Sequence, residues 1–513
     1  MKLNYKRTIC VGFAFFLICA FWQAYDNIIP LILTNKFGLS QADSGIIMAF
    51  DNILALFMLP LFGALSDKTN SKLGKRTPYV LIGTIIAVIA FVALTFADSA
   101  QLAKLGSVSQ IDSEQSLSVL YDHEYKSPLM TPEGESFELD EKFTKKEFLA
   151  IRSVDENGDT NPDYTNYVEP ARQAYANQQT GADTAPLITF IAILLVVLIA
   201  MAIFRSPAVA LMPDVTIKPL RSKGNAVINL MGSAGGIIVL ALGAVFATGS
   251  LKNSMMNYTV FFSVVGGVML IALVVFMLTV REPRFVKEMQ EESAKYNIDE
   301  SSEDENGEKR KLTKGELASL LLILASVILW YMGYNAVTSK YSVYASKILN
   351  LDYNMTLILA QAAAIIAYIP VGIISSKIGR KKAILAGVVM LCTAFGVAAF
   401  LKSDSPAMLM NCMFALAGIG WATINVNSFP MVVELAKGGD VGKYTGFYYT
   451  ASMAAQTFTP YLSGLLMDKY GMWTLFPYAA VCVAAAFITM LFVRHGDSKP
   501  IQKNALEALD VDA

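Results

Sequence analysis

Two aspartates, Asp26 and Asp51, lie inside apolar stretches near the start of the chain. Trp22 stands four residues before Asp26, on the same side of a helix, and Asn52 follows Asp51 directly. A carboxyl group removed from water holds its proton to higher pH than an exposed one, so it can bind and release a proton near neutral pH. Two carboxylates with an Asn oxygen could instead hold Na⁺. We therefore predict that Asp26 and Asp51 bind a monovalent cation, although an Asp26 that faces water at an interface would need no such role.

The segments that carry these residues have the composition of membrane helices. The chain has 513 residues, of which 54% are hydrophobic and 16% are charged, whereas soluble proteins carry roughly 25% charged residues. An apolar helix of about 20 residues crosses a bilayer and satisfies its own backbone there. The sequence predicts an all-α membrane protein with twelve such helices, near residues 8–34, 42–65, 78–97, 186–205, 223–249, 258–280, 315–337, 355–376, 383–401, 406–431, 443–467 and 473–493.

The predicted helices form two sets of six, separated by a charged linker. A polar, acidic insert between the third and fourth helices is either functional or a small folded unit. The linker is rich in Glu, Lys and Ser, and we expect it to be largely disordered because it cannot bury a core. The predicted division is a first half at 1–97 with 186–281, an insert at 98–185, a linker at 282–314, a second half at 315–494 and a tail at 495–513.

Lysine and arginine gather in loops on one side of the predicted membrane. These loops include residues 2–7, 68–76, 218–223 and 380–382, whereas the opposite short loops hold only scattered lysines. Cytoplasmic loops carry an excess of Lys and Arg. We therefore predict a multi-pass protein of the plasma membrane with both termini and the linker in the cytoplasm and the insert outside.

The most specific local pattern is GALSDKTNSKLGKRTP at residues 63–78, between the second and third helices. A related piece, GIISSKIGRKK, occurs at the corresponding place in the second half, at 372–382. Such internal repeats indicate a duplicated six-helix unit, as in secondary transporters. Glycines let helices approach closely, and Asp67 could pair with a basic residue across the interface between the halves and hold one conformation. Basic residues that only set topology would not account for Asp67 or the glycines.

The form G-x-x-S-D-(x)6-G-[KR]-R-x-P at 63–78 resembles the major facilitator superfamily. Within it, the chain is most similar to sucrose–proton symporters and to glycoside–pentoside–hexuronide cation symporters. Further support comes from RSPAVALMPD at 205–214, RSKGN at 221–225, and GIGWA with a later Phe-Pro pair within 418–430. The resemblance extends over nearly the whole chain except 98–185.

The resemblance implies the major facilitator fold, with alternating access between two six-helix pseudo-repeats around a central site. It implies secondary active, proton-coupled symport of a sugar (a disaccharide or other glycoside). We expect a monomer without a cofactor, and Asp26 and Asp51, which lie within the first two predicted helices, are the candidate coupling-ion sites. A sodium-coupled symporter, or an exporter of a sugar or other small polar solute, is the alternative. Lys68 and Lys75 stand where these relatives usually carry Arg. The residues expected at a cytoplasmic gate are Gly63, Asp67, Gly74, Arg76, Arg205, Asp214, Gly379 and Arg380.

A sugar site needs aromatic faces and many amide or hydroxyl partners for the ring hydroxyls. Aromatic residues are also common at membrane interfaces, and amides also join helices by hydrogen bonds, so both have a purely structural alternative. The predicted solute-binding residues are Trp22, Gln23, Asn27, Asn52, Trp330, Tyr334, Asn335, Gln361, Trp421, Asn425, Tyr449 and Gln456.

The insert contains a partial calcium-loop pattern. Asp155, Asn157, Asp159 and Asp163 stand at oxygen-ligand positions of such a loop, but Thr160 occupies the place of its sharp-turn glycine. An acidic, solvated turn is the favoured interpretation, and no other metal site is predicted.

Other function classes lack their signatures. The chain contains no G-x-x-x-x-G-K-[ST], H-E-x-x-H or G-x-S-x-G pattern, and both histidines, His123 and His495, lie outside the predicted helices. An ATP-driven pump and a membrane enzyme are therefore unsupported, and the net charge of -1 gives no basic surface for nucleic acid. A membrane sensor that binds ligand through its insert remains a further alternative.

Overall fold

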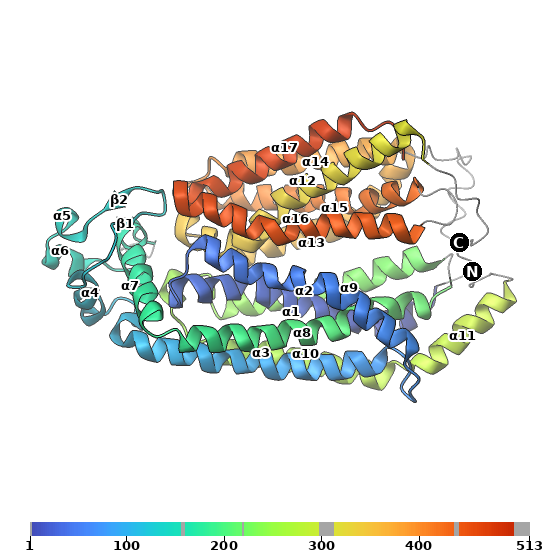
Figure 1. Ribbon diagram of the computed structural model, residues 1–513, viewed down its shortest axis with the longest axis horizontal. Coiled ribbons are helices and arrows are strands. Elements are labelled where there is room, and N and C mark those ends of the chain that lie inside the picture. The colour runs from blue at the N-terminus through green and yellow to red at the C-terminus, as the bar shows by residue number, and fades with distance from the viewer. Residues whose placement is uncertain (1–2, 155–159, 218–219, 297–311, 436–440, 497–513) are drawn as a thin grey trace.

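Two bundles of long helices lie side by side in the computed structural model (Figure 1), which describes residues 3–154, 160–217, 220–296, 312–435 and 441–496. The first half, in blue to green, contains α1 (Tyr5–Leu31) with its π-helical continuation η1 (Ile32–Lys36), α2 (Gln41–Lys68), α3 (Thr77–Leu105), α8 (Ala185–Asp214), α9 (Arg221–Val245) and α10 (Thr259–Thr279). The second half, in yellow to red, contains α12 (Lys314–Tyr344) with η6 (Ala345–Leu349), α13 (Tyr353–Ile378), α14 (Arg380–Ala398), α15 (Ala407–Glu434), α16 (Val441–Tyr470) and α17 (Leu475–Leu491).

The predicted fold class is confirmed. Among the described residues, ten helices are long and apolar enough to cross a membrane, and α13 and α16 complete the two sets of six. Each half has its own hydrophobic core, which contains Phe91 and Leu194 in the first half and Trp330 and Phe476 in the second. The halves are thus separately packed units that meet along one interface.

The structure has two opposite faces, named here by their sequence features. The insert face carries residues 106–154 and 160–182, which lie beyond the helix ends at the left of Figure 1. The basic face carries the turn between α2 and α3 and the turn between α13 and α14, together with the start of α1. Gly74 and Gly379 stand in these two turns with φ of 109° and 93°, a conformation that favours glycine.

Helix α3 continues to Leu105, beyond the end predicted near residue 97. The added turns contain Asp98 and Gln101, both fully buried, which lower the mean hydropathy there. Lys36 Nζ lies 2.6 Å from Asp98 Oδ1 and 2.7 Å from the Met256 carbonyl oxygen, and Gln101 donates to the Lys36 carbonyl oxygen at 2.9 Å. Asp98, the Lys36 ammonium and the Gln101 amide nitrogen each have a partner, which lowers the cost of keeping these groups inside the protein.

The insert is a folded unit with a core of its own. After the 3-10 turn η2 (Gly106–Ser109) it contains α4 (Glu114–Tyr121), β1 (Leu129–Met130), β2 (Ser136–Phe137), α5 (Leu139–Lys142), α6 (Lys145–Ala150), η3 (Tyr164–Val168) and α7 (Glu169–Ala182). The two strands pair antiparallel, with Leu129 opposite Phe137. Leu117, Phe148 and Tyr164 are fully buried in a cluster that also takes in Leu251 from the loop between α9 and α10. The insert is therefore anchored on the first half by apolar packing as well as by the chain.

The start of the linker is helical, which corrects the expectation of disorder there. Helix α11 (Glu282–Lys295) buries Met289 against Leu3, Ile217 and Leu220 at the basic face. The remaining linker residues 297–311 lie outside the described part of the chain. A few apolar residues on one side of this charged segment suffice for docking, although the composition alone suggests a solvated chain.

Glu282, at the start of α11, caps helix α3. Its carboxylate accepts hydrogen bonds from the backbone amides of Lys75, Arg76 and Thr77 at 2.6, 3.0 and 2.8 Å, and from the Thr77 hydroxyl at 2.7 Å. The first amides of a helix have no acceptor within the helix, and a negative charge is favourable at this end.

We expect Glu282→Ala to destabilise the first half by about 1–3 kcal/mol, because buried amide donors lose their acceptor. The thermal unfolding midpoint of the detergent-solubilised protein measures this loss. Glu291→Ala is the matched control, since Glu291 is an exposed glutamate on the same helix. Equal midpoints for the two variants would contradict a capping role for Glu282.

Candidate functional site

A cavity of about 170 Å³ lies between the two halves near the middle of the helices. Five helices surround it, namely α1, α2 and α8 of the first half and α12 and α16 of the second. Polar side chains form most of its wall. Its lining residues are Trp22, Tyr25 and Asp26 from α1, Met48, Asp51 and Asn52 from α2, Arg205 from α8, Asn335 and Ser339 from α12, and Gln456 and Pro460 from α16.

The cavity brings two carboxylates and one guanidinium together. Asp26 and Asp51 are close enough to repel one another, and the positive charge of Arg205 attracts both. Asn52 Nδ2 donates to Asp51 Oδ1 at 2.6 Å, and the Arg205 guanidinium lies 5.3 Å from the centre of the Trp22 ring. With both carboxylates ionised, the three groups carry one excess negative charge, and one monovalent cation would neutralise it.

Six residues expected at a solute or ion site line this cavity: Trp22, Asp26, Asp51, Asn52, Asn335 and Gln456. Arg205 also lines it, which corrects its expected place at a gate with Arg76 and Asp214. Arg205 lies in the middle of α8, nine residues before Asp214, so the helix rise separates them by about 13 Å. Arg205 thus belongs to the central cavity.

A second predicted group joins the halves beside the cavity. Gln361 of α13 donates a hydrogen bond to the side-chain oxygen of Gln23 of α1. Gly236 of α9 leaves room for this pair, because a Cβ there would stand 2.9 Å from Gln361 Oε1. Asn27 is buried and donates to the Gln23 carbonyl oxygen at 2.7 Å, so its amide supports α1 itself.

The remaining predicted aromatic residues lie in the second half at different depths. Trp330 is fully buried in the core of that half, which corrects its expected place at a solute site. Tyr334 stacks on Trp421 with ring centres 3.7 Å apart. Asn425 is partly buried, and Tyr449 is half exposed on α16 beside Phe429. The sequence could not distinguish the buried Trp330 from Tyr334, because the two residues are one helical turn apart and lie on the same side of α12.

At the insert face, two charged residues of the second half hold the start of α2. Asp468 of α16 accepts hydrogen bonds from the backbone amides of Gln41 and Ala42 at 2.8 and 2.7 Å. Lys340 of α12 is fully buried and donates to the Gln41 carbonyl oxygen at 2.5 Å. Asp468 therefore caps a helix of the other half, and sequence reasoning missed both charges because they fall in short polar breaks near helix ends.

Glycines close the same interface by letting α2 and α16 touch. A Cβ on Gly45 would stand 2.2 Å from the Pro460 carbonyl oxygen, and one on Gly464 would stand 2.3 Å from the Gln41 carbonyl oxygen. Nearby, Tyr353 of α13 hydrogen-bonds Thr248 after α9 at 2.7 Å. These contacts seal the insert face above the central cavity.

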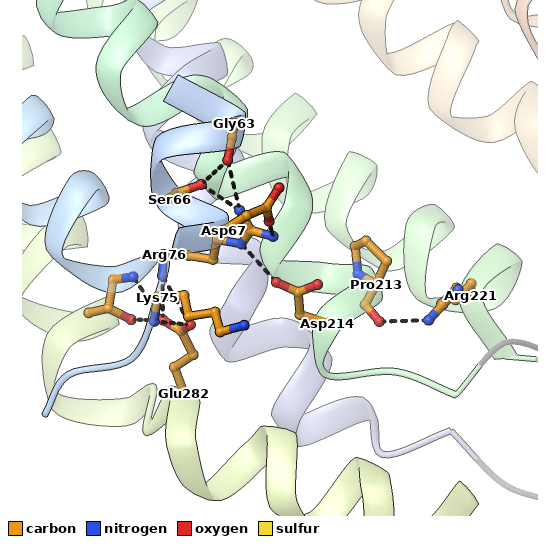
Figure 2. Close-up of polar contacts among 10 residues, drawn as sticks. Gly63, Ser66, Asp67, Lys75, Arg76, Pro213, Asp214, Arg221 and Glu282 are labelled. Atoms are coloured by element: carbon orange, nitrogen blue, oxygen red, sulfur yellow. Dashed lines mark hydrogen bonds and ion pairs between the residues drawn. The ribbon is translucent and has the colours of Figure 1, made fainter. Parts of the chain in front are cut away.

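At the basic face, Arg76 joins three helices of the first half (Figure 2). Its Nε donates to Asp214 Oδ2 at 2.8 Å, and its guanidinium also binds Asp67 and the Ser66 hydroxyl. Burial alone would lower the pKa of Arg76, but the hydrogen bonds and charges of Asp214 and Asp67 raise it above its usual value. The guanidinium therefore stays charged, and it ties the end of α2 to the end of α8.

The predicted gate residues thus form contacts within each half. Asp67 pairs with Arg76 of its own half instead of with a residue across the interface, and Gly63 offers its carbonyl oxygen to the same network. Gly74 leaves room for Glu282, whose carboxyl carbon would stand 2.3 Å from an added Cβ. In the second half, Arg380 donates to the Pro430 carbonyl oxygen at 3.4 Å. The partners of Arg76 all belong to the first half, so this basic-face network stabilises that half.

The calcium-loop pattern finds no support in the described residues. Residues 155–159, with Asp155, Asn157 and Asp159, lie outside the described part of the chain. Asp163 is exposed, and its backbone amide binds the Asn161 side chain at 3.0 Å. Within the described ranges, no three His, Cys, Asp or Glu residues gather as a metal site would require.

A two-half bundle with a charged cavity between the halves is the architecture of a membrane transporter, and comparison with known proteins identifies its class. The model of the Major Facilitator Superfamily matches residues 180–436 and 353–510, and the model described as MFS/sugar transport protein matches 10–108. The chain belongs to the Major Facilitator Superfamily, as its sequence motifs predict.

Individual relatives are more distant. The chain is 34% identical over 73 residues to an uncharacterized symporter, YnaJ, of Bacillus subtilis (strain 168), a match that spans 14% of this chain and 16% of that protein. The inward open structure of the xylose transporter XylE from E. coli has a TM-score of 0.60 at 14% identity and covers 98% of both chains. A structure of the nucleoside transporter NupG has a TM-score of 0.51 at 12% identity, over 96% of this chain and 100% of the other. At these identities the structural likeness concerns the fold.

The insert-face closure gives a prediction about Asp468. We expect Asp468→Ala to open this face more often, because two amides lose a charged acceptor worth about 1–2 kcal/mol, or roughly five- to thirtyfold in the equilibrium. A cysteine at the cavity residue Ser339, in a background without the five native cysteines, reports opening through its labelling by a membrane-impermeant maleimide added at the insert face.

Asp404→Ala is the control, since Asp404 is exposed in the loop between α14 and α15 at the same face. Labelling that rises no more in Asp468→Ala than in this control would show that the cap does not hold the face closed.

Proposed function

We propose that this protein is a secondary active transporter that moves a sugar together with a proton by alternating access. The observation that carries the proposal is the central cavity, where Asp26, Asp51 and Arg205 meet between the halves. With both carboxylates ionised, these three groups carry one excess negative charge. An uncompensated charge inside a protein is costly. Binding of one proton to the carboxylate pair would neutralise the cavity and lower the cost of closing it around a solute.

The other lining groups suit a polyhydroxylated solute. Trp22 offers an aromatic face, and Asn52, Asn335 and Gln456 offer amides that both donate and accept hydrogen bonds. The match of residues 10–108 to a sugar-transport family model includes the segments of α1 and α2 that bear both carboxylates. The relatives described as a xylose transporter and as a symporter support the same assignment.

Solute size follows from the cavity. Its volume of about 170 Å³ lies below the roughly 300–1,000 Å³ of pockets that hold drug-sized ligands. The family resemblance suggests a disaccharide or other glycoside, whereas this conformation favours a smaller sugar. A panel that contains both sizes is therefore the appropriate screen.

Orientation and location are part of the proposal. The clustering of Lys and Arg at the basic face supports a cytoplasmic position for that face and for both termini, with the insert outside the cell. We assign the protein to the plasma membrane as a monomer, with no cofactor, and its work is to carry a solute rather than to convert one.

Sodium is the second candidate coupling ion. The same two carboxylates, with the side-chain oxygen of Asn52, could supply oxygen ligands to Na⁺ in place of a proton. Export of the solute uses the same site in the reverse direction. Uptake that depends on external Na⁺ would indicate sodium coupling instead of proton coupling. Depletion of the solute from cells would indicate export instead of import.

The test is external pH in a lightly buffered suspension of de-energised cells that express the protein, as mono- and disaccharides are added in turn. Alkalinisation with one sugar, absent in control cells, is the expected result, because each sugar that enters removes a proton from the medium. No pH change with any sugar, together with uptake of a labelled sugar that requires Na⁺, would replace the proton with sodium.

We expect Asp26→Asn and Asp51→Asn each to abolish concentrative uptake, since a neutral amide cannot take up the coupling proton. The ratio of internal to external sugar should fall to that of passive equilibration, while the amount of protein in the membrane stays unchanged. Asp43→Asn is the control, because Asp43 is exposed at the start of α2. Wild-type accumulation by both cavity variants would remove these residues from the coupling mechanism.

A further inference from the structure

The insert binds the first half through the segment between α1 and α2. Asn177 of α7 donates to the Gly38 carbonyl oxygen and Gln173 donates to the Leu39 carbonyl oxygen, both at 3.0 Å. Gln101 of α3 also donates to the Thr180 hydroxyl at 3.0 Å. With the apolar cluster around Leu251, these contacts make the insert an extension of the first half.

The insert also binds the second half, but through fewer and mostly polar contacts. The Pro132 carbonyl oxygen, beside the short hairpin, accepts a hydrogen bond from the Met472 backbone amide at 2.8 Å. Lys347, within η6, is buried and donates to Gln173 Oε1 at 2.9 Å. The single side chain of Gln173 therefore joins the two halves, since its amide nitrogen binds Leu39 and its oxygen binds Lys347.

A cavity of about 630 Å³ underlies this bridge, lined by the insert, by the start of α2 and by the ends of η6 and α16. The insert consequently meets the second half mainly around the rim of the cavity. Segments with few buried apolar contacts separate at low free energy. The insert is attached to the first half by the chain itself and by apolar packing, whereas its contacts with the second half are few and polar. The contacts with the second half are therefore the ones that can break.

We propose that the described part of the insert, residues 106–154 and 160–182, acts as an external clasp that holds the insert face closed. The inference rests on the proposed alternating access, because opening this face must separate Gln41 from Asp468 and carry the first half away from the second. The insert then moves with the first half, and its contacts at Met472 and Lys347 break in each cycle. The clasp biases the protein toward the conformation that is closed at the insert face.

A reversible cross-link tests the clasp directly. The hydrogen bond between Pro132 and Met472 brings their backbones within the range of a disulfide, so the pair Pro132→Cys with Met472→Cys can be oxidised and reduced. The pair is introduced with Ser339→Cys into a background without the native cysteines. Labelling of position 339 by a membrane-impermeant maleimide from the insert face, measured by peptide mass spectrometry, reports opening without any solute.

The expected result is at least a tenfold loss of labelling after complete oxidation and its return after reduction. The control pair, Met130→Cys with Ser136→Cys, links opposed residues of the two strands within the insert and should change nothing. Labelling unaffected by a complete Pro132–Met472 cross-link would overturn the clasp, as would an equal loss in the control pair. Absence of labelling even in the reduced protein would instead refute opening of this face, and with it the proposed alternating access.

A second variant avoids the cross-link. Lys347→Met keeps the length of a buried side chain and removes its bond to Gln173, so labelling at position 339 should rise several-fold. Lys104→Met is the control, because Lys104 pairs with Asp183 on the first half alone. Equal labelling in the two variants would overturn the proposed role of Lys347 in the clasp.

Discussion

The amides at the start of a helix need acceptors that the helix itself cannot supply, and this constraint organises both ends of the molecule. The first amides of α3 find the carboxylate of Glu282, and those of α2 find the carboxylate of Asp468. The first acceptor comes from the same half and fixes α11 beneath it. The second comes from the other half and seals the insert face. The same backbone requirement thus produces a contact within one half at the basic face and a contact between the two halves at the insert face.

The central cavity depends on the same contact between the two halves. Asp26, Asp51 and Asn52 come from the first two helices, whereas Asn335 and Gln456 come from α12 and α16 of the second half. The cavity is complete only while these helices approach each other, and Gly45 and Gly464 permit that approach at the insert face. Closing one face and assembling the polar lining of the cavity are therefore one rearrangement, as the proposed alternating access between two halves requires.

Hydropathy and helix geometry were enough to predict the twelve helices and the two carboxylates of the cavity. Both predictions depend on local sequence. An apolar run must form a helix in lipid, and a carboxylate within such a run is costly, so it indicates a functional role. The length of α3 was underestimated because Asp98 is acceptable inside the protein only through Lys36, which lies 62 residues earlier in the chain. The docked part of the linker was missed because the partners of Met289, Leu3 and Leu220, also lie far from it in sequence, 286 and 69 residues earlier. Arg205 and Trp330 were misplaced for a related reason: which side of a membrane helix faces a cavity is set by its neighbours, and periodicity does not identify them.

The cap on α2 has a consequence for the solvent. While the insert face is closed, Asp468 and Lys340 satisfy the polar backbone groups of Gln41, and the neighbouring Ser44 is fully buried. In the proposed transport cycle, opening of this face requires water to take the place of each of these partners and to hydrate two charged side chains as well. The conformational equilibrium of the transporter is therefore also a hydration equilibrium. Osmolytes that are excluded from protein surfaces oppose such exposure, so the osmotic strength of the surroundings sets part of the balance between the two conformations.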